Sequence, residues 1–172
     1  SERYGSKEFL ILTYTPNEGM VTETSVNNLL SLKYKIQSLN WVHSVITLLD
    51  IPLLSNSDSP LQERLENFKT LKDEDVDRNR GFKEILNSPV FRNFVISEDG
   101  NTSGIIVNIK ENKKFDNSKN KSKKEIEDYK DSIKKQNHEN ILEIRDVIKS
   151  YEDIGKIHLG GIPMIADDMM SF

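Results

Sequence analysis

Asp167 and Asp168 form the only adjacent acidic pair near a glycine-rich turn, the Gly-Gly-Ile-Pro segment at 160–163. Two carboxylates could bind a divalent cation or share a proton. Adjacent residues on a helix, however, point about 100° apart, which is a poor start for a shared site. Negative charge in the first turn of a helix is also stabilised by the positive end of the helix dipole. We therefore interpret the pair as helix-start charges and predict no metal site there.

The three histidines, His43, His138 and His158, show no metal-ligand spacing such as i, i+4. We expect His138 near a helix start and the other two on strands. The chain has no cysteine, which excludes thiol catalysis, zinc–thiolate sites and disulfides together. The sequence therefore predicts no metal site.

The serines and glycines lack the context of a catalytic or nucleotide site. Ser44, Ser97 and Ser103 are not in a Gly-x-Ser-x-Gly nucleophile elbow. Gly160-Gly161 is followed by Ile-Pro and not by the Lys-Ser/Thr of a phosphate-binding loop. We predict no catalytic residue and no cofactor, so the chain is not expected to be an enzyme.

The composition restricts the class of protein further. Charged residues make up 30% of the 172 residues, and the formal net charge is −4. An acidic balance argues against nucleic acid as a partner, because such binders are usually basic. The lysine run at 113–124 is interleaved with Asn, Ser and Asp, which is typical of a solvated insertion. No window of about 18 apolar residues exists, so nothing in the chain is expected to span a bilayer.

The first third of the chain predicts a β-α-β unit. A β-branched and aromatic run over 9–15 indicates a strand, and the Pro-Asn-Glu-Gly turn at 16–19 closes it. A helix follows, which Thr24 or Ser25 could cap, and a second strand is expected over 42–49. The apolar stripe of the helix consists of Val26, Leu29, Leu32, Ile36 and Leu39.

Residues 51–90 have a different pattern, which we interpret as a helical insertion. Ser59-Pro60-Leu61-Gln62 has the form of a capping box with proline at the first helical position. A second short helix is expected over 82–86. Strands over 91–96 and 104–110 flank Asp99-Gly100, a good hairpin signal.

The segment at 111–137 is polar and lysine-rich, and we expect a second insertion there. Ser122 and Glu125 form a capping box before a short helix with three apolar residues, which would be marginal alone. A separate last helix is expected to end at Gly155, with a final strand over 156–159. The apolar face of the last helix consists of Ile141, Ile144, Ile148 and Tyr151.

These elements predict one α+β domain over 1–172. Without the helical insertion and one extra hairpin strand, their order is the split βαβ (βαββαβ) arrangement of a ferredoxin-like fold. In that topology the first and last strands are antiparallel neighbours. The chain is therefore expected to enter near Tyr4 and leave near Gly160 at the same edge. Some enzymes with this fold hydrolyse acyl phosphates, but they need a cationic loop after the first strand, and 15–19 reads Thr-Pro-Asn-Glu-Gly.

Four segments in order resemble the first extracytoplasmic (porter) loop of exporters of the resistance-nodulation-division superfamily, in its MMPL-like, hydrophobe-exporting branch. The Gly-Gly-Ile-Pro-Met-Ile-Ala-Asp-Asp segment at 160–168 is similar to the approach to the second membrane helix there. The segment at 4–16 looks like the strand after the first membrane helix, 41–54 like the second strand, and 97–102 is a weaker match. The polar stretch at 111–137 is longer than the family pattern.

The resemblance implies a bacterial inner-membrane protein whose domain faces the periplasm. Such exporters move lipids or other hydrophobic compounds outward, driven by proton flow. The implied partners are the hydrophobic or lipid-like substrate, the second porter loop of the same protein and the parent protein in the membrane. The proton-coupling acidic groups would lie in membrane helices outside this chain.

The alternative is a freestanding module that binds a small ligand or a partner protein without catalysis. The two hypotheses predict different genes. On the exporter hypothesis, the reading frame continues past Phe172 into about 20 apolar residues, and a similar run precedes Ser1. Sequencing the gene tests this, and a stop codon shortly after Phe172 would refute the exporter hypothesis.

Overall fold

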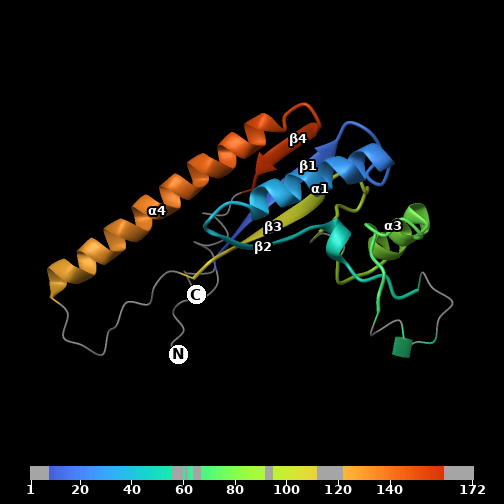
Figure 1. The fold of residues 1–172 in the computed structure, drawn as a ribbon, viewed down its shortest axis with the longest axis horizontal. Coiled ribbons are helices and arrows are strands. Elements are labelled where there is room, and N and C mark those ends of the chain that lie inside the picture. Colours follow the sequence, from blue (N-terminus) through green and yellow to red (C-terminus); the bar gives the residue numbers. More distant parts are fainter. Residues whose placement is uncertain are drawn as a thin grey trace.

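Strand β1 (Phe9–Pro16) alternates between buried and partly buried residues along most of its length, as expected when one face of a strand lies in the core. The computed structural model describes residues 8–55, 60, 62–63, 67–91, 95–111 and 122–160. In this part of the chain, β1 pairs antiparallel with both β3 (Ser103–Ile109) and β4 (Gly155–Leu159), and β2 (Val42–Ile46) pairs with β3. The result is a four-stranded antiparallel sheet in the order β2-β3-β1-β4 (Figure 1), which confirms the α+β class.

The first and last strands are direct neighbours, as the sequence predicted. Leu12 is opposite Leu159 and Pro16 is opposite Gly155 in the antiparallel register. The Gly160 backbone N–H continues the pairing beyond β4 and donates to the Ile11 carbonyl at 2.7 Å. The described chain therefore enters β1 and leaves β4 at the same end of the sheet.

Helices α1 (Glu23–Gln37) and α4 (Lys123–Ser150) lie on one face of the sheet (Figure 1). Four of the five residues of the predicted stripe, Val26, Leu29, Leu32 and Ile36, are buried. Leu39 lies after the end of α1 and is only partly buried. Tyr14 of β1 points to the same side and donates its hydroxyl hydrogen to the Ser25 carbonyl of α1. Burial raises the pKa of Tyr14 to about 12. The cap of α1 is Thr22, whose hydroxyl accepts from the Ser25 N–H, and not Thr24 or Ser25.

Strand β2 is shorter than predicted. It ends at Ile46, and Leu48–Asp50 forms a 3₁₀ helix, η2. The apolar residues Leu48 and Leu49 hid this change in the sequence, because they are fully buried and resemble the continuation of the strand. Thr47 ends the strand by capping η2: its hydroxyl accepts from the Leu49 N–H, and the Asp50 carboxylate accepts from the Thr47 N–H.

The two helices predicted after residue 111 are one continuous helix. The capping box of Ser122 and Glu125 is present and begins α4, which runs unbroken to Ser150. All buried residues of α4, namely Asn140, Ile144 and Val147, lie in its second half. The first half extends past the sheet (Figure 1), so the part of the predicted polar insertion from 123 to 137 is a helical extension. Residues 112–121 lie outside the described residues.

The sequence predicted that Gly155 is the C-cap of the last helix, and this prediction is wrong. Helix α4 ends at Ser150, and Gly155 opens β4 with φ of 153°. A Cβ atom at this position would overlap the Thr15 carbonyl oxygen. The glycine is therefore required by the close approach of β4 to β1.

The segment between η2 and β3 contains the predicted short helix, which begins earlier than expected. Helix α3 spans Arg78–Leu86 and is capped by the Asp77 carboxylate, which accepts from the Arg80 N–H. Ser59 and Leu61 of the capping box predicted at 59–62 lie outside the described residues. The expected hairpin strand over 91–96 is reduced, among described residues, to one bridge pair between Ile96 and Ser103. Residues 92–94 lie outside the description.

Within the described ranges, the helices lack the combination of length and apolar character that crossing a bilayer needs.

Ile144 tests the packing of α4 on the sheet, because its side chain is fully buried. Replacing it with Asp should destabilise the protein by several kcal/mol, roughly 3 or more, because a charge enters the core. Leu142 of the same helix is 50% exposed and provides the matched control. Thermal unfolding followed by circular dichroism should show a large loss for I144D and little change for L142D. Equal melting of the two variants would show that the helix face is wrong.

Candidate functional site

The residues singled out in the sequence do not come together in one site. His43 lies on β2 and His158 on β4, as expected, while His138 lies inside α4 and not near its start. All three side chains are exposed. Asp167, Asp168 and Gly161 fall outside the described residues. Within the described part of the chain, no group of three or more His, Cys, Asp or Glu residues is arranged to hold a metal ion.

The serines have structural surroundings. Ser97 begins the turn before β3, where its hydroxyl donates to Asp99 at 2.6 Å. This hydrogen bond, together with the Asn101 N–H, lowers the pKa of the exposed Asp99 carboxyl. Ser44 accepts a hydrogen bond from the Asn108 side chain at 3.0 Å across β2 and β3. Ser103 is buried.

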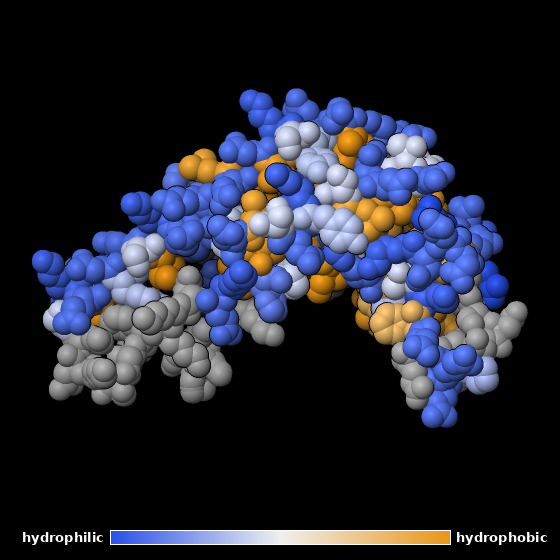
Figure 2. Space-filling view, in the orientation of Figure 1, coloured by the Kyte–Doolittle hydropathy of each residue, from blue (hydrophilic) through white to orange (hydrophobic). Residues whose placement is uncertain are grey.

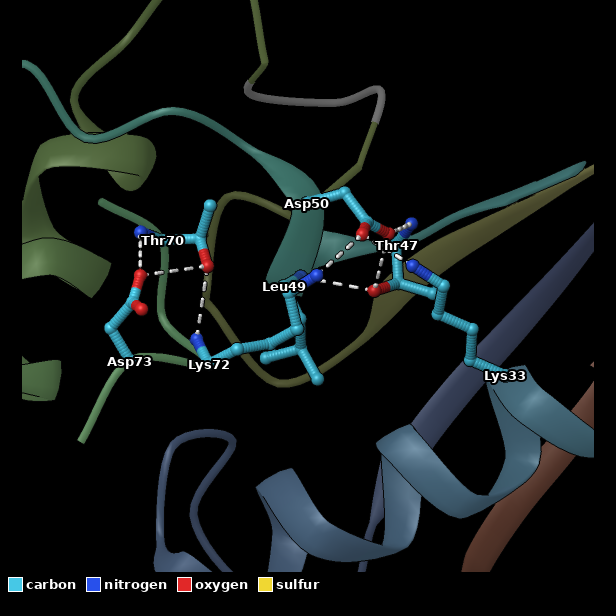
Figure 3. A network of polar contacts seen from close by, with 7 residues as sticks. All are labelled: Lys33, Thr47, Leu49, Asp50, Thr70, Lys72 and Asp73. Carbon is cyan, nitrogen blue, oxygen red and sulfur yellow. Dashed lines mark hydrogen bonds and ion pairs between the residues drawn. The ribbon is translucent and has the colours of Figure 1, made fainter. Parts of the chain in front are cut away.

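The structure does bring charged residues together around Asp50 (Figure 3). The buried Lys33 of α1 forms an ion pair with Asp50 of η2. Lys72, from the segment before α3, places its ammonium 3.4 Å from the same Asp50 oxygen. One carboxylate thus connects α1, the end of β2 and the inserted segment.

A repeated turn builds this cluster. Thr47-Leu-Leu-Asp50 and Thr70-Leu-Lys-Asp73 share the pattern Thr-Leu-x-Asp. In both, the Thr N–H donates to the Asp carboxylate at 2.8 Å, and the Thr hydroxyl accepts from the N–H two residues later. The second turn buries Leu71 and leaves Lys72 directed at Asp50. Sequence reasoning missed the cluster, although the repeated four-residue pattern was a readable signal.

The charges around Asp50 indicate a structural carboxylate that stays ionised and not a catalytic one. Burial alone would raise the pKa of Asp50. Hydrogen bonds from Lys33 and Thr47 and the charges of Lys33 and Lys72 outweigh burial, so the pKa lies below its ordinary value. A carboxylate held ionised by two ammonium groups is poorly suited to proton transfer near neutral pH. We interpret the cluster as the ionic contact that holds the inserted segment (51–90) to the sheet.

The sheet face opposite α1 and α4 resembles a binding surface more than the Asp50 cluster does. Residues that point away from α1 and α4 alternate with core residues along each strand. We name these residues the open face. They are Phe9, Ile11, Thr13 and Thr15 of β1; Ser44 and Ile46 of β2; Gly104, Ile106 and Asn108 of β3; and Lys156 and His158 of β4.

An apolar row crosses three strands of the open face. Ile46 pairs with Ile106, and Ile106 pairs with Ile11, so the three side chains lie in one line across β2, β3 and β1. Phe9 lies on the same face and is partly buried. Ile46 is 37% exposed, although apolar β-branched side chains are usually covered. This row was not predicted, because the short strands did not show which of their faces the helices cover.

Polar groups flank the row. Beside the row, farther along β2 and β3, an open groove of about 530 Å³ is lined by His43, Ser44, Asn108, Ile109, Lys110 and Glu111. On the β4 side, Lys156 and His158 are opposite Thr15 and Thr13. No strand position of the open face carries an acidic residue, in a chain with 28 Asp and Glu against 24 Lys and Arg. The opposite side of the molecule, seen in Figure 2, is mostly hydrophilic with scattered apolar patches.

Comparisons with known proteins give no match: no family model, no curated protein and no solved structure matches this chain.

Asp50→Asn tests the ionic contact between the sheet and the inserted segment. The change leaves the buried Lys33 without its charge partner and should destabilise the protein by about 2 kcal/mol or more near neutral pH. The matched control is Asp75→Asn, which removes an exposed ion pair with Lys69 and should change little. Urea unfolding of each variant measures the difference.

The pH dependence of stability in the same variants tests whether the charge of Asp50 causes the difference. A lowered pKa stabilises the folded state above the ordinary Asp value of 3.8, and this contribution disappears as the pH falls through the lowered pKa. The stability gap between wild type and D50N should therefore shrink below about pH 3.8. A gap that stayed constant in acid would contradict the charge-based explanation.

Proposed function

We propose that this chain is the first extracytoplasmic domain of a proton-driven exporter of the resistance-nodulation-division superfamily, which moves lipids or other hydrophobic compounds. The observation that carries the proposal is the antiparallel pairing of β1 with β4. A domain held between two membrane helices needs its entering and leaving strands at one end, and the described chain has this geometry. The domain would face the periplasm of a bacterial inner-membrane protein.

The topology supports the same proposal. The order β2-β3-β1-β4, with α1 between β1 and β2 and α4 between β3 and β4, fits a ferredoxin-like βαββαβ sheet. On this proposal the α3 segment and the outer part of α4 are additions to that sheet. The porter loops that the sequence resembles are expected to have this arrangement.

The open face supports a role in a pathway for hydrophobic compounds. An apolar row on the sheet face that α1 and α4 leave uncovered gives a surface on which an apolar compound could lie, or against which a second porter loop could pack. The cluster around Asp50 would hold the inserted segment to the sheet, so that the domain moves as one body between transport states. The chain would contribute no catalytic residue.

Export by the whole protein tests the proposal. Bacteria expressing the full reading frame should extrude the lipophilic dye Nile red when energised, and a protonophore should abolish the extrusion. The I144D variant should lose extrusion because the domain unfolds, whereas L142D, changed at an exposed position of the same helix, should retain it. Extrusion that is absent from the wild type, or unaffected by I144D, would contradict the proposal and favour the freestanding binding module.

A further inference from the structure

The charge distribution of the open face selects one kind of occupant. Its apolar row, Ile46, Ile106 and Ile11, crosses the sheet from the edge strand β2 to β1, so that its Ile11 end faces β4. On β4, beyond the Ile11 end of the row, lie Lys156 and His158. His43 and Lys110 line the groove beside the row, farther along β2 and β3. All four of these side chains are exposed.

The shortage of acidic groups makes this face different from the rest of the protein. The chain as a whole has a formal net charge of −4, yet the strand positions of the open face carry only neutral and basic residues. Glu111 is the single acidic residue that lines the groove, and it lies after the end of β3. An apolar chain with a negative head group therefore has complementary contacts here, whereas a cationic amphiphile would meet like charges.

We infer that the open face binds a single anionic amphiphile, with its alkyl chain along the Ile46–Ile106–Ile11 row and its carboxylate beside Lys156 and His158 of β4. The inference rests on the proposed function for the hydrophobic class of cargo and adds the sign of its charge. The neutral donors Thr13 and Asn108 on the same face can hydrogen-bond a head group without opposing its charge. The occupant is one dispersed molecule and not a membrane surface.

Laurate is the probe, and two detergents with the same alkyl chain are its controls. Calorimetric titration of the chain, below the micelle concentration, should give the tightest binding for laurate, weaker binding for dodecyl maltoside and the weakest for dodecyltrimethylammonium. Acetate, which lacks the chain, should not bind. Equal affinity for the three amphiphiles, or no binding of laurate, would overturn the inference, as would binding only to anionic lipid vesicles.

Matched variants place the ligand on the open face. Ile46→Ser should weaken laurate binding by about fivefold, because an exposed part of the apolar row is removed. Leu142→Ser changes a comparably exposed side chain on α4 and should have no effect. If both variants weaken binding equally, or neither does, the ligand does not lie on the row.

The charge contribution has its own pair of variants. Lys156→Glu should weaken laurate about threefold to tenfold and leave dodecyl maltoside unchanged, and added salt should reduce the difference. Lys149→Glu, on the exposed side of α4, is the control that should change neither. An equal effect of Lys156→Glu on the charged and neutral amphiphiles would contradict the head-group contact.

The outcome separates this inference from the proposed function. If the full protein extrudes Nile red but the chain does not prefer laurate, the exporter proposal stands and the open-face site is wrong. If the chain binds laurate on the open face but the full protein does not extrude dye, the binding module is favoured and the site remains.

Discussion

Strand β1 is hydrogen-bonded along both of its edges, to β3 on one side and to β4 on the other, and the rest of the structure depends on this pairing. The pairing joins the first and last described elements of the chain. It also sets which side chains of β1 face α1, because a shift of one residue would exchange the two faces. Tyr14 would then leave its hydrogen bond to Ser25, and Ile11 would enter the core. The fixed register thus separates a packed face from an open one.

The second constraint is electrostatic and lies at the end of β2. Asp50 brings two lysines from different segments to one carboxylate, and it is the charge partner of the buried Lys33. Burial of an ion pair contributes less to stability than its short contacts suggest, since both charges lose water. The ion pair acts mainly on the arrangement of the segments, because it keeps the turn that carries Lys72 near η2. The inserted segment is therefore held in one place although α3 is remote from the strands.

Much of the fold follows from local patterns in the sequence. The alternation of β1, the stripe of α1 and the capping box at Ser122 each predict their elements, because neighbouring residues determine them. The errors occur where tertiary contacts decide. The apolar residues within 42–49 do not reveal that the strand ends at Ile46 and that Thr47 and Asp50 form the capping box of a 3₁₀ helix. The polar first half of α4 likewise hides its continuity with the packed half. The open face depends on which side the helices cover, and the Asp50 cluster joins residues far apart in sequence. The periodicity of a single segment therefore predicts neither the open face nor the Asp50 cluster.

Helix α4 has 28 residues, which corresponds to about 42 Å, whereas an eight-residue strand such as β1 spans only about 27 Å. Only the second half of the helix contributes buried side chains to the core. Whole turns could therefore be added to or removed from the outer half while every contact of Ile144 and Val147 is kept. The reach of this arm can change in evolution independently of the sheet, whereas a change in the length of β1 would alter its pairing with both neighbours.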